Sequence, residues 1–358
     1  MVNTVLGPIS ASKMGATLAH EHCFMDSDTE LWVKPEDVPK RFAHLFYEPV
    51  SISNLDLVKR AAGYSVDNGN NDSIPERLQE LNAFKAAGGG TVVDVTPPGL
   101  GRDNHVHKLP KVSKISGVHI VAATGQYVEA TYPSRIKEQT ADQVAQDFIK
   151  EITEGIMETG IKAGVIKTCL SPNKFSDADR KVLIAATIAQ KETGVPITVH
   201  MWGDRPGKWP GYKIIEVLQR NDVDPGKFYM SHIEWTENLE KDWGVPINAA
   251  CAGVYVCIDN FGREYPYGSL DNTWDDFGYM GCPTDVDRVK LIKRLIEEGY
   301  EDKIVVGHDS AYKIQKLAYG GPGLGHILNN VPTLFKRLEV DQKYFNKIMV
   351  DNPQKLFG

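Results

Sequence analysis

The sequence lacks long apolar runs and an excess of positive charge. No stretch approaches the roughly 18 consecutive apolar residues that a membrane-spanning helix needs, and the mean hydropathy is -0.30. The 40 Lys and Arg residues are outnumbered by 47 Asp and Glu residues, which leaves a net charge of -7. A nucleic-acid-binding protein would instead show a basic patch or stripe. We therefore expect no membrane and no nucleic acid among its partners, and a small-molecule substrate in their place.

Paired cysteines and a leader-like N-terminus are also missing. The chain has five scattered cysteines, and none has the CxxC spacing of a zinc or redox site: Cys23, Cys169, Cys251, Cys257 and Cys282. An odd, sparse set of this kind favours a reducing compartment. The opening residues, MVNTVLGPIS, contain neither the basic segment nor the continuous apolar run of a signal peptide. The sequence thus predicts a cytoplasmic protein.

A glycine-rich phosphate loop is absent as well, although strand and helix patterns alternate along the whole chain. Neither GxGxxG nor GxxxxGK[ST] follows any of the predicted strands, which argues against an open doubly wound sheet. Short apolar runs bounded by turn residues predict buried strands. They lie at 16–22, 91–95, 119–125, 163–169, 196–200, 228–232, 253–259 and 303–309. Helices are predicted between them at 73–87, 141–159, 176–194, 212–220, 285–299 and 331–338.

Eight strand–helix units predict an α/β protein, a (β/α)8 TIM barrel, with a single domain over residues 1–358. Such a barrel uses about 250 residues, so roughly a hundred are left over. Much of this excess falls at 23–72 and 260–283, directly after predicted strands. We therefore expect long loops at the C-terminal face of the barrel. The Gly-rich segment 310–325 there fits either a mobile lid or a series of tight turns.

Polar side chains recur where these strands end. His20 and His22 end the first strand, Lys167 the fourth, His200 the fifth and His232 the sixth, and Asp309 follows the eighth. The ends of barrel strands meet at one face, where active sites lie. Imidazole and carboxylate ligands suit zinc and related metals. A buried lysine with a lowered pKa would be neutral, and it could then react with carbon dioxide to give an anionic carbamate able to bridge two metals.

The combination resembles the phosphotriesterase family of the amidohydrolase superfamily, in particular its phosphotriesterase-related and lactonase branches. The segments that carry the resemblance are TLAHEHCFMD, AGVIKT, VVGHDSA, YGGPGLGHILNNVPTLFKRL and KIMVDNPQKLF, which together span nearly the whole chain. The resemblance implies two divalent metals, with zinc as the first expectation and Mn, Co or Fe as alternatives. It implies that His20, His22 and Asp309 hold the more buried metal and that His200 and His232 hold the more exposed one. N6-carboxylated Lys167 and a hydroxide would bridge the two.

This ligand set predicts a binuclear metal-dependent hydrolase in which the metal-bridging hydroxide attacks a lactone or carboxylic ester carbonyl. Asp309 would take the proton of the attacking group, and His232 would help to pass it outward. An N-acyl amide and an organophosphate triester are the alternative substrates, and a non-catalytic binding protein is the alternative class. The family also implies a possible homodimer.

Substrate contacts are expected from the loops that follow the strands. Tyr127 follows the third strand and resembles a tyrosine that lies beside the metals in lactonases. Trp202 and Arg205 follow the fifth strand; they could bind an apolar substrate with an anionic group, or instead cap the barrel or pack at a dimer interface. Asp259 and Arg263 follow the seventh strand. The resemblance suggests a leaving-group contact for Asp259, and the alternative is a structural ladder to backbone amides or to Arg263.

Overall fold

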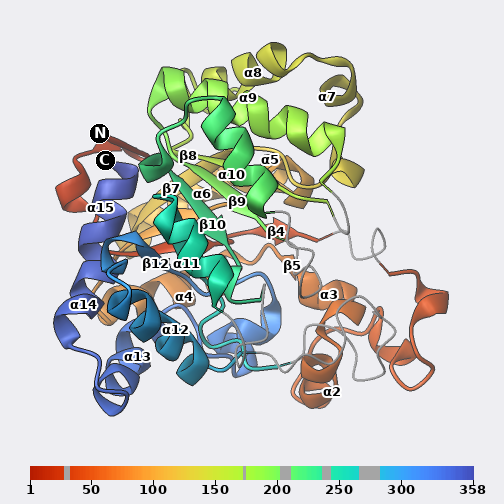
Figure 1. The fold of residues 1–358 in the computed structure, drawn as a ribbon. Helices are drawn as coiled ribbons and strands as arrows, with labels where there is room; N and C mark the ends of the chain where they lie inside the picture. The colour runs from red at the N-terminus through yellow and green to blue at the C-terminus, as the bar shows by residue number, and fades with distance from the viewer. Residues whose placement is uncertain (28–32, 172–174, 202–210, 236–242, 266–282) are drawn as a thin grey trace.

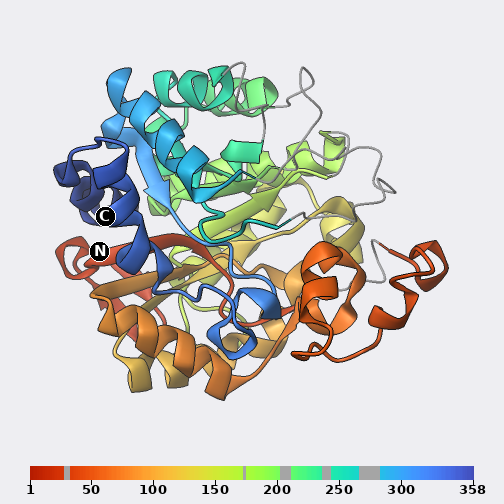
Figure 2. The same cartoon turned by 90° about the horizontal axis from the view of Figure 1, so that it is seen from below.

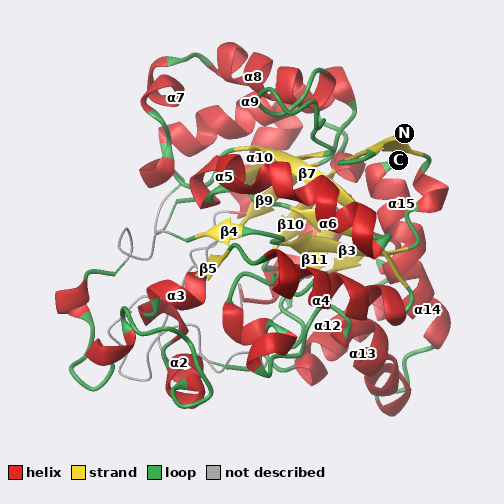
Figure 3. Cartoon of the chain, turned by 180° about the vertical axis from the view of Figure 1, so that it is seen from behind, coloured by secondary structure: helices red, strands yellow, loops and turns green. Residues whose placement is uncertain are grey.

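Eight parallel strands form the centre of the protein, as a computed structural model shows for residues 1–27, 33–171, 175–201, 211–235, 243–265 and 283–358. The strands, yellow in Figure 3, are hydrogen-bonded in the order β12-β11-β10-β9-β8-β7-β6-β3. Their bounds are β3 (Ala16–Glu21), β6 (Gly89–Asp94), β7 (His119–Gly125), β8 (Val165–Cys169), β9 (Ile197–His200), β10 (Phe228–Ser231), β11 (Tyr255–Ile258) and β12 (Ile304–Val306). The predicted α/β barrel is confirmed, with each strand inside or close to its predicted range.

The first and last strands approach each other where the barrel closes. The backbone N–H of Asp309 donates a hydrogen bond to the carbonyl oxygen of His20 at 3.2 Å. A Cβ atom placed on Gly307 would lie 2.6 Å from the same carbonyl oxygen. Glycine is therefore required at this position because any side chain would push β12 away from β3. This closure brings the segment after β12 next to the two histidines of β3.

Helices surround the strands in all three views of the chain (Figures 1, 2 and 3). Their bounds are α4 (Ile74–Ala86), α5 (Arg102–His105), α6 (Leu109–Ser116), α7 (Ser134–Glu138), α8 (Ala141–Thr153), α9 (Asp177–Thr193), α10 (Gly211–Arg220), α11 (Gly244–Cys251), α12 (Asp285–Glu297), α13 (His326–Arg337), α14 (Gln342–Asn346) and α15 (Asn352–Phe357). Thr140, Ser176 and Thr284 begin α8, α9 and α12 with reciprocal capping boxes, which satisfy the otherwise free amides of the first turn. Within the described residues, no helix has the length and apolar character needed to cross a bilayer.

The helices differ from the sequence expectation in several places. The predicted helix at 141–159 ends at Thr153, and the chain then turns through Gly155 with φ of 142°. The helix expected from 331 begins five residues earlier, at His326, with Pro332 inside it. Helix α11 had no prediction because GVPINAAC is short and has no polar face. Local patterns locate helix interiors better than helix ends, because the ends depend on neighbouring contacts.

The segment between β3 and α4 forms an insertion beside the barrel, coloured red to orange in Figures 1 and 2. It contains the two-stranded sheet β4 (Met25–Asp26) and β5 (Asn70–Asn71), and the helices α2 (Leu55–Arg60) and α3 (Val66–Gly69). Its apolar side chains form a cluster of their own that includes Phe42, Leu45 and Phe46, and that also takes in Ile314 from the segment after β12. The surplus length at 23–72 is therefore loop material that packs against another loop of the catalytic face, as expected.

The two chain ends lie side by side (Figure 1). The N-terminal hairpin of β1 (Val2–Thr4) and β2 (Gly7–Ile9) contributes Val2 to a buried cluster. Leu356 and Phe357 of α15 belong to the same cluster, which continues into the barrel strands at Tyr229 and Val305.

Candidate metal centre

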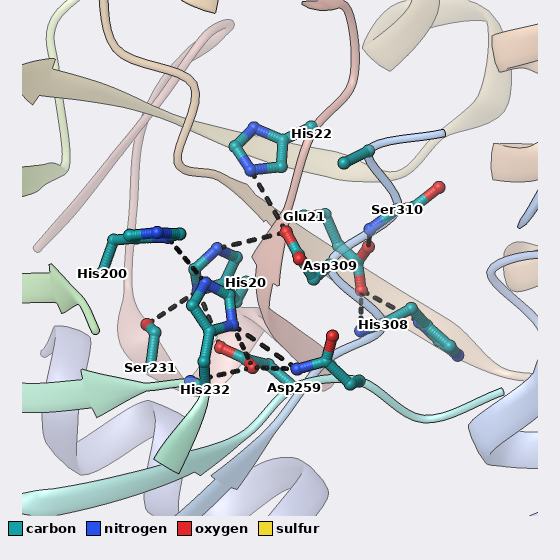
Figure 4. A network of polar contacts seen from close by, with 12 residues as sticks. His20, Glu21, His22, His200, Ser231, His232, Asp259, His308, Asp309 and Ser310 are labelled. Carbon is teal, nitrogen blue, oxygen red and sulfur yellow. Dashed lines mark hydrogen bonds and ion pairs between the residues drawn. The ribbon is translucent and has the colours of Figure 1, made fainter. Parts of the chain in front are cut away.

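Five of the six predicted metal ligands come together in direct contact. His22 Nε2 lies 3.3 Å and His20 Nε2 3.6 Å from Asp309 Oδ1. Lys167 Nζ lies 3.3 Å from His20 Nε2. On the other side of His20, the ring of His232 lies 4.7 Å away between centroids. Figure 4 shows His20, His22, His200 and His232 gathered with Asp309 in one cluster.

The sixth predicted ligand, His200, joins the group through His232. The atoms His232 Nε2 and His200 Nδ1 are 2.9 Å apart, and both side chains end parallel neighbouring strands. One set of ligand atoms, from His20, His22 and Asp309, lies within 4.8 Å of one another, and so does a second set from His20, His232 and Asp259. The structure thus brings all six predicted residues to one face of the barrel, where the carboxyl ends of its strands meet.

Two of these residues have an unusual backbone. His232 has φ of 62° and Asp309 has φ of 47°, so both lie in the left-handed region. This region is uncommon for residues other than glycine and costs roughly 1–3 kcal/mol when the surrounding structure imposes it. Both residues come immediately or shortly after a strand ends, at Ser231 and Val306 respectively. The left-handed turn directs each side chain across the mouth of the barrel instead of along the strand.

Burial governs the ionisation of the nitrogen groups in this cluster. Burial and the neighbouring Lys167 lower the pKa of His20 to about 3. Burial lowers the pKa of Lys167 as well, although nearby thiol and carboxyl groups oppose it. The pKa of His200 is well below its usual range because the ring is buried beside His232. Neutral imidazole nitrogens and a lysine with a lowered pKa are the forms that can act as ligands or react with carbon dioxide.

Two buried groups carry opposite charges at the same place. Burial alone would raise the pKa of Asp309, but His232 and His22 hold it well below the usual range. Burial alone would lower the pKa of His232, but the carboxylates of Asp259 and Asp309 raise it. Ionised carboxylates buried in a barrel need a cation nearby. A proton on His232 is one such cation, and a metal ion would take its place.

Asp259 lies beneath the histidines. Its Oδ1 accepts a hydrogen bond from the His232 backbone N–H at 3.0 Å and lies 2.8 Å from His232 Nδ1. Its Oδ2 lies 2.8 Å from His20 Nδ1, and the side chain is fully buried. Asp259 thus contacts the rings of two predicted metal ligands, and its predicted leaving-group contact stays a prediction. The sequence could not distinguish these roles, because both require an aspartate at the end of the seventh strand.

Hydroxyl and carboxyl groups orient the remaining histidines. His20 Nδ1 also lies 2.7 Å from Ser231 Oγ. His22 Nδ1 lies 2.9 Å from Thr96 Oγ1, which in turn donates to Asp94 Oδ1 at 2.5 Å. A partner on Nδ1 fixes the ring so that Nε2 points into the cluster. The sequence analysis missed Ser231, Thr96 and Asp94, although each also lies at the end of a strand.

Glu21, between the two histidines of β3, is a further residue that the sequence analysis missed. It is fully buried and points to the opposite face of the strand from them. Its Oε1 accepts from the His308 backbone N–H at 2.7 Å and lies 2.9 Å from His308 Nδ1. Its Oε2 accepts from the Ser310 backbone N–H at 3.0 Å (Figure 4). The carboxylate therefore holds the chain on both sides of Asp309.

The predicted substrate contacts have different positions. Tyr127 packs edge to face on His200, with 5.5 Å between ring centroids, so it borders the cluster. Arg263 Nη1 donates to Asp309 Oδ2 at 3.0 Å and to Asn260 Oδ1 at 2.8 Å. Trp202 and Arg205 lie outside the described residues. Arg263 is thus an immediate neighbour of a predicted metal ligand.

The donor set fits divalent metal ions. Several imidazole nitrogens and one ionised carboxylate converge within a few ångströms, all on buried side chains. His20, His22 and His232 each have a hydrogen-bonding partner on Nδ1, as metal-ligating histidines usually do on the nitrogen that does not bind the metal. Nitrogen and oxygen donors of this kind suit zinc, and also manganese, iron and cobalt.

Histidines, a lysine and an aspartate converge at the carboxyl-end face of this (β/α)8 barrel. This arrangement is typical of metal-dependent hydrolases. Comparison with known proteins identifies the family. The model of the phosphotriesterase family matches residues 1–357, and the chain belongs to that family. It is a metal-dependent hydrolase.

Curated relatives cover nearly the whole chain. The N-acetyltaurine hydrolase of Xenopus tropicalis is 34% identical over 358 residues, covering 99% of this chain and 97% of that protein. The N-acetyltaurine hydrolase of Rattus norvegicus is 34% identical over 357 residues, with the same coverage. Among solved structures, a resiniferatoxin-binding protein from Rhodobacter sphaeroides has a TM-score of 0.88 at 27% identity and covers 99% of this chain and 94% of its own. A mutant PTE-like lactonase from Deinococcus radiodurans has a TM-score of 0.74 at 25% identity, with both chains fully covered.

Proposed function

We propose that this protein hydrolyses the amide bond of a small N-acyl compound at a centre of two divalent metal ions. The observation that carries the proposal is the convergence of buried, mutually oriented histidines with Asp309 and Lys167 at one face of the barrel. The curated relatives that support an amide substrate are named for the hydrolysis of N-acetyltaurine and are 34% identical over the whole chain. Their substrate is an acylated amine that carries an anionic group, and we extend that class to this chain.

In this proposal each ligand has a defined role. His20, His22 and Asp309 would hold one metal, His200 and His232 would hold the other, and Lys167, as a carbamate, would supply an anionic ligand to both. The carbamate forms when the neutral Nζ bonds to the carbon of carbon dioxide and loses a proton. Burial, which lowers the pKa of Lys167, supports this step because only the unprotonated amine reacts. We propose zinc as the metal because of its preference for nitrogen and oxygen donors, with Mn, Co or Fe as alternatives.

Bound metals of this kind lower the pKa of water and polarise a carbonyl oxygen. The protein's own groups then handle the proton. Asp309 Oδ1 faces the two histidines of β3, and its Oδ2 is held by Arg263, so the carboxylate is fixed where it can accept a proton from the attacking water. The leaving amine of an amide must be protonated before it departs. We propose that Asp309 delivers that proton, with His232 as its buried neighbour in the relay.

A lactone or carboxylic ester is the second candidate substrate. Tyr127 packs on His200 at the edge of the cluster, which supports this candidate because the resemblance implies a tyrosine beside the metals in lactonases. The solved PTE-like lactonase at 25% identity supports the same class. Tyr127 is 9% exposed, so it could contact a substrate bound at the cluster. The remaining alternatives are a phosphotriester and non-catalytic binding.

Two measurements test this function. Metal analysis of the purified protein should give about two transition-metal ions per chain, and fewer than one would contradict the centre. A panel of N-acyl amino acids, N-acyl aminosulfonates, lactones and aryl phosphotriesters should be compared by kcat/KM. We expect N-acyl compounds with an anionic group to lead, and a lactone or phosphotriester that exceeds them by orders of magnitude would overturn the amide assignment.

The lysine has its own test. Lys167→Ala should lose most of the activity together with bound metal, and a short carboxylate such as acetate should restore part of both. Full activity of this variant without added carboxylate would contradict the bridging role.

The cellular and quaternary setting is also part of the proposal. The described cysteines, Cys23, Cys169, Cys251 and Cys257, are free thiols, which supports a reducing, cytoplasmic compartment. We propose one domain over residues 1–358 and a homodimer, by analogy with the family. Sedimentation of the purified protein would decide between monomer and dimer.

A further inference from the structure

Gln315 is a buried amide whose side chain is hydrogen-bonded to the backbone around Asp309. It lies in the segment after β12, and only 3% of its surface is exposed. Its Oε1 accepts from the backbone N–H of Ala311 at 3.0 Å and of Tyr312 at 2.8 Å. Its Nε2 donates to the carbonyl oxygens of His308 at 3.1 Å and of Asp309 at 3.0 Å. The amide thus uses both of its donors and both acceptor positions on the chain from 308 to 312.

The backbone of this segment has a conformation that is unfavourable without support from the rest of the fold. Asp309 has φ of 47°, in the left-handed region that residues other than glycine rarely adopt. From the barrel side, Glu21 accepts from the backbone N–H groups of His308 and Ser310, on each side of Asp309. From the other side, Gln315 binds the carbonyls of His308 and Asp309. Two buried side chains from different parts of the fold therefore enclose one strained residue.

We infer that Gln315 is a positioning residue that, together with Glu21, holds Asp309 in its metal-binding orientation. The inference rests on the proposed role of Asp309 as a metal ligand. The Asp309 carboxylate can face His20 and His22 only while its backbone keeps the left-handed turn. Without the four hydrogen bonds of Gln315, the turn relaxes toward ordinary backbone angles and the carboxylate moves away from the histidines.

The chemistry requires glutamine at this position. A methionine would keep the length of the side chain but lose all four hydrogen bonds. A glutamate would keep the two acceptor contacts to Ala311 and Tyr312, but it would place an oxygen against the carbonyls of His308 and Asp309. The same four hydrogen bonds also hold the segment after β12 in tight turns. Lys313 pairs with Asp67 at 2.6 Å and Lys316 with Glu76 at 2.9 Å, so the segment is bound to the rest of the fold along its length.

The test compares Gln315→Glu and Gln315→Met with the control Asn352→Leu. Asn352 is also a fully buried amide. It donates to the carbonyl oxygen of Ile304 at 2.7 Å, at the start of β12 and thus at the end of that strand far from Asp309. The probe is Co²⁺ alone, added to metal-free full-length protein, with affinity measured by chelator competition and geometry by the cobalt absorption spectrum. We expect one of the two cobalt ions to bind about 10- to 100-fold more weakly to both Gln315 variants, with an altered spectrum. We also expect kcat to fall more than KM rises.

The control separates positioning from stability. Asn352→Leu should unfold more readily but keep cobalt affinity within about twofold of the wild type and an unchanged spectrum. If Gln315→Met does not fold, Gln315→Glu, which keeps two of the four contacts, carries the test. Wild-type cobalt affinity and spectrum in Gln315→Glu, with a wild type that binds two ions, would overturn this inference alone. A wild type that binds no cobalt would contradict the proposed function and this inference together.

Discussion

The replacement Asp259→Asn tests how one carboxylate supports both halves of the centre. Asp259 is fully buried and faces His20 Nδ1 and His232 Nδ1, each at 2.8 Å. It also accepts from the backbone N–H of His232, which has a left-handed backbone. An asparagine has nearly the same shape, but it carries no charge and presents an NH2 group to one of the two rings. One ring N–H would then meet a donor instead of an acceptor.

The expected cost follows from burial. The two histidines hold the pKa of Asp259 below its usual range despite burial, which would raise it, so the carboxylate is ionised at neutral pH. Removing one partner of a buried, hydrogen-bonded ion pair costs about 3–5 kcal/mol. Loss of a group that orients metal-binding histidines typically weakens metal affinity by about 10- to 100-fold. We therefore expect the free energy of unfolding of the metal-free protein to fall by about 3 kcal/mol, and both metal-binding steps to weaken.

Urea denaturation of the metal-free protein and calorimetric titration with zinc measure the two effects separately. Asp179→Asn is the matched control, because Asp179 is also buried and accepts from Ser171 and Ser176 instead of from histidines. The control should lose stability but retain zinc affinity. In the proposed assignment each metal would contact a histidine that Asp259 orients, so weaker binding of only one metal would refute the shared role. Unchanged stability and affinity would refute the whole argument.

Three other expectations follow from the structure. Burial lowers the pKa of Lys316 to about 8, so between about pH 8 and 10.5 the unfolded chain binds a proton that the folded chain does not. The free energy of unfolding should therefore rise with pH in this range, and less steeply in Lys316→Met. Equal slopes for the two proteins in urea titrations at several pH values would contradict this. Gly125→Ala should lower the free energy of unfolding in the same assay by about 3 kcal/mol or more, because φ is 116° and the new Cβ would overlap the Lys167 carbonyl. Gly160→Ala, with φ of 72° and open space around the Cβ position, should lower it by only about 1–2 kcal/mol. Removal of metal by a chelator should lower the Tm measured by calorimetry and added zinc should restore it, and a Tm that is indifferent to both would contradict a metal site.

The strands were predictable because each carries its own signal. A short run such as HIVAATG is apolar throughout and bounded by turn residues, and it forms β7 over the predicted residues. Strands of this kind are buried on both faces by helices, so local composition suffices. Helix α13 shows the opposite case, since it begins at His326 after a series of tight turns and contains Pro332. Its start depends on where the preceding segment is bound, which no local pattern records.

The convergence of the candidate ligands was predictable, whereas the side chains that support them were not. His20, His22 and His200 stand at strand ends that a barrel must bring together. The sequence offered a substrate contact for Asp259, and the contacts of this carboxylate with His20 and His232 became visible only in the structure. Gln315 gave no signal at all, because a glutamine in a polar segment is ordinary until its four partners are known.

The sequence by itself determined the barrel and the chemistry of its mouth. The alternation of short apolar strands with helices predicts parallel strands in a barrel, and this arrangement places every carboxyl-end residue at one face. The tertiary structure alone decided which residues hold those ligands in place, because such contacts join segments distant in the chain. Glu21 binds the backbone of Ser310, beside Asp309, although the two residues are 289 positions apart in the chain. Contacts of this kind hold Asp309 in its left-handed backbone conformation. The local sequence supplies the side chains at the strand ends, and tertiary packing sets the orientation in which each one contacts its partners.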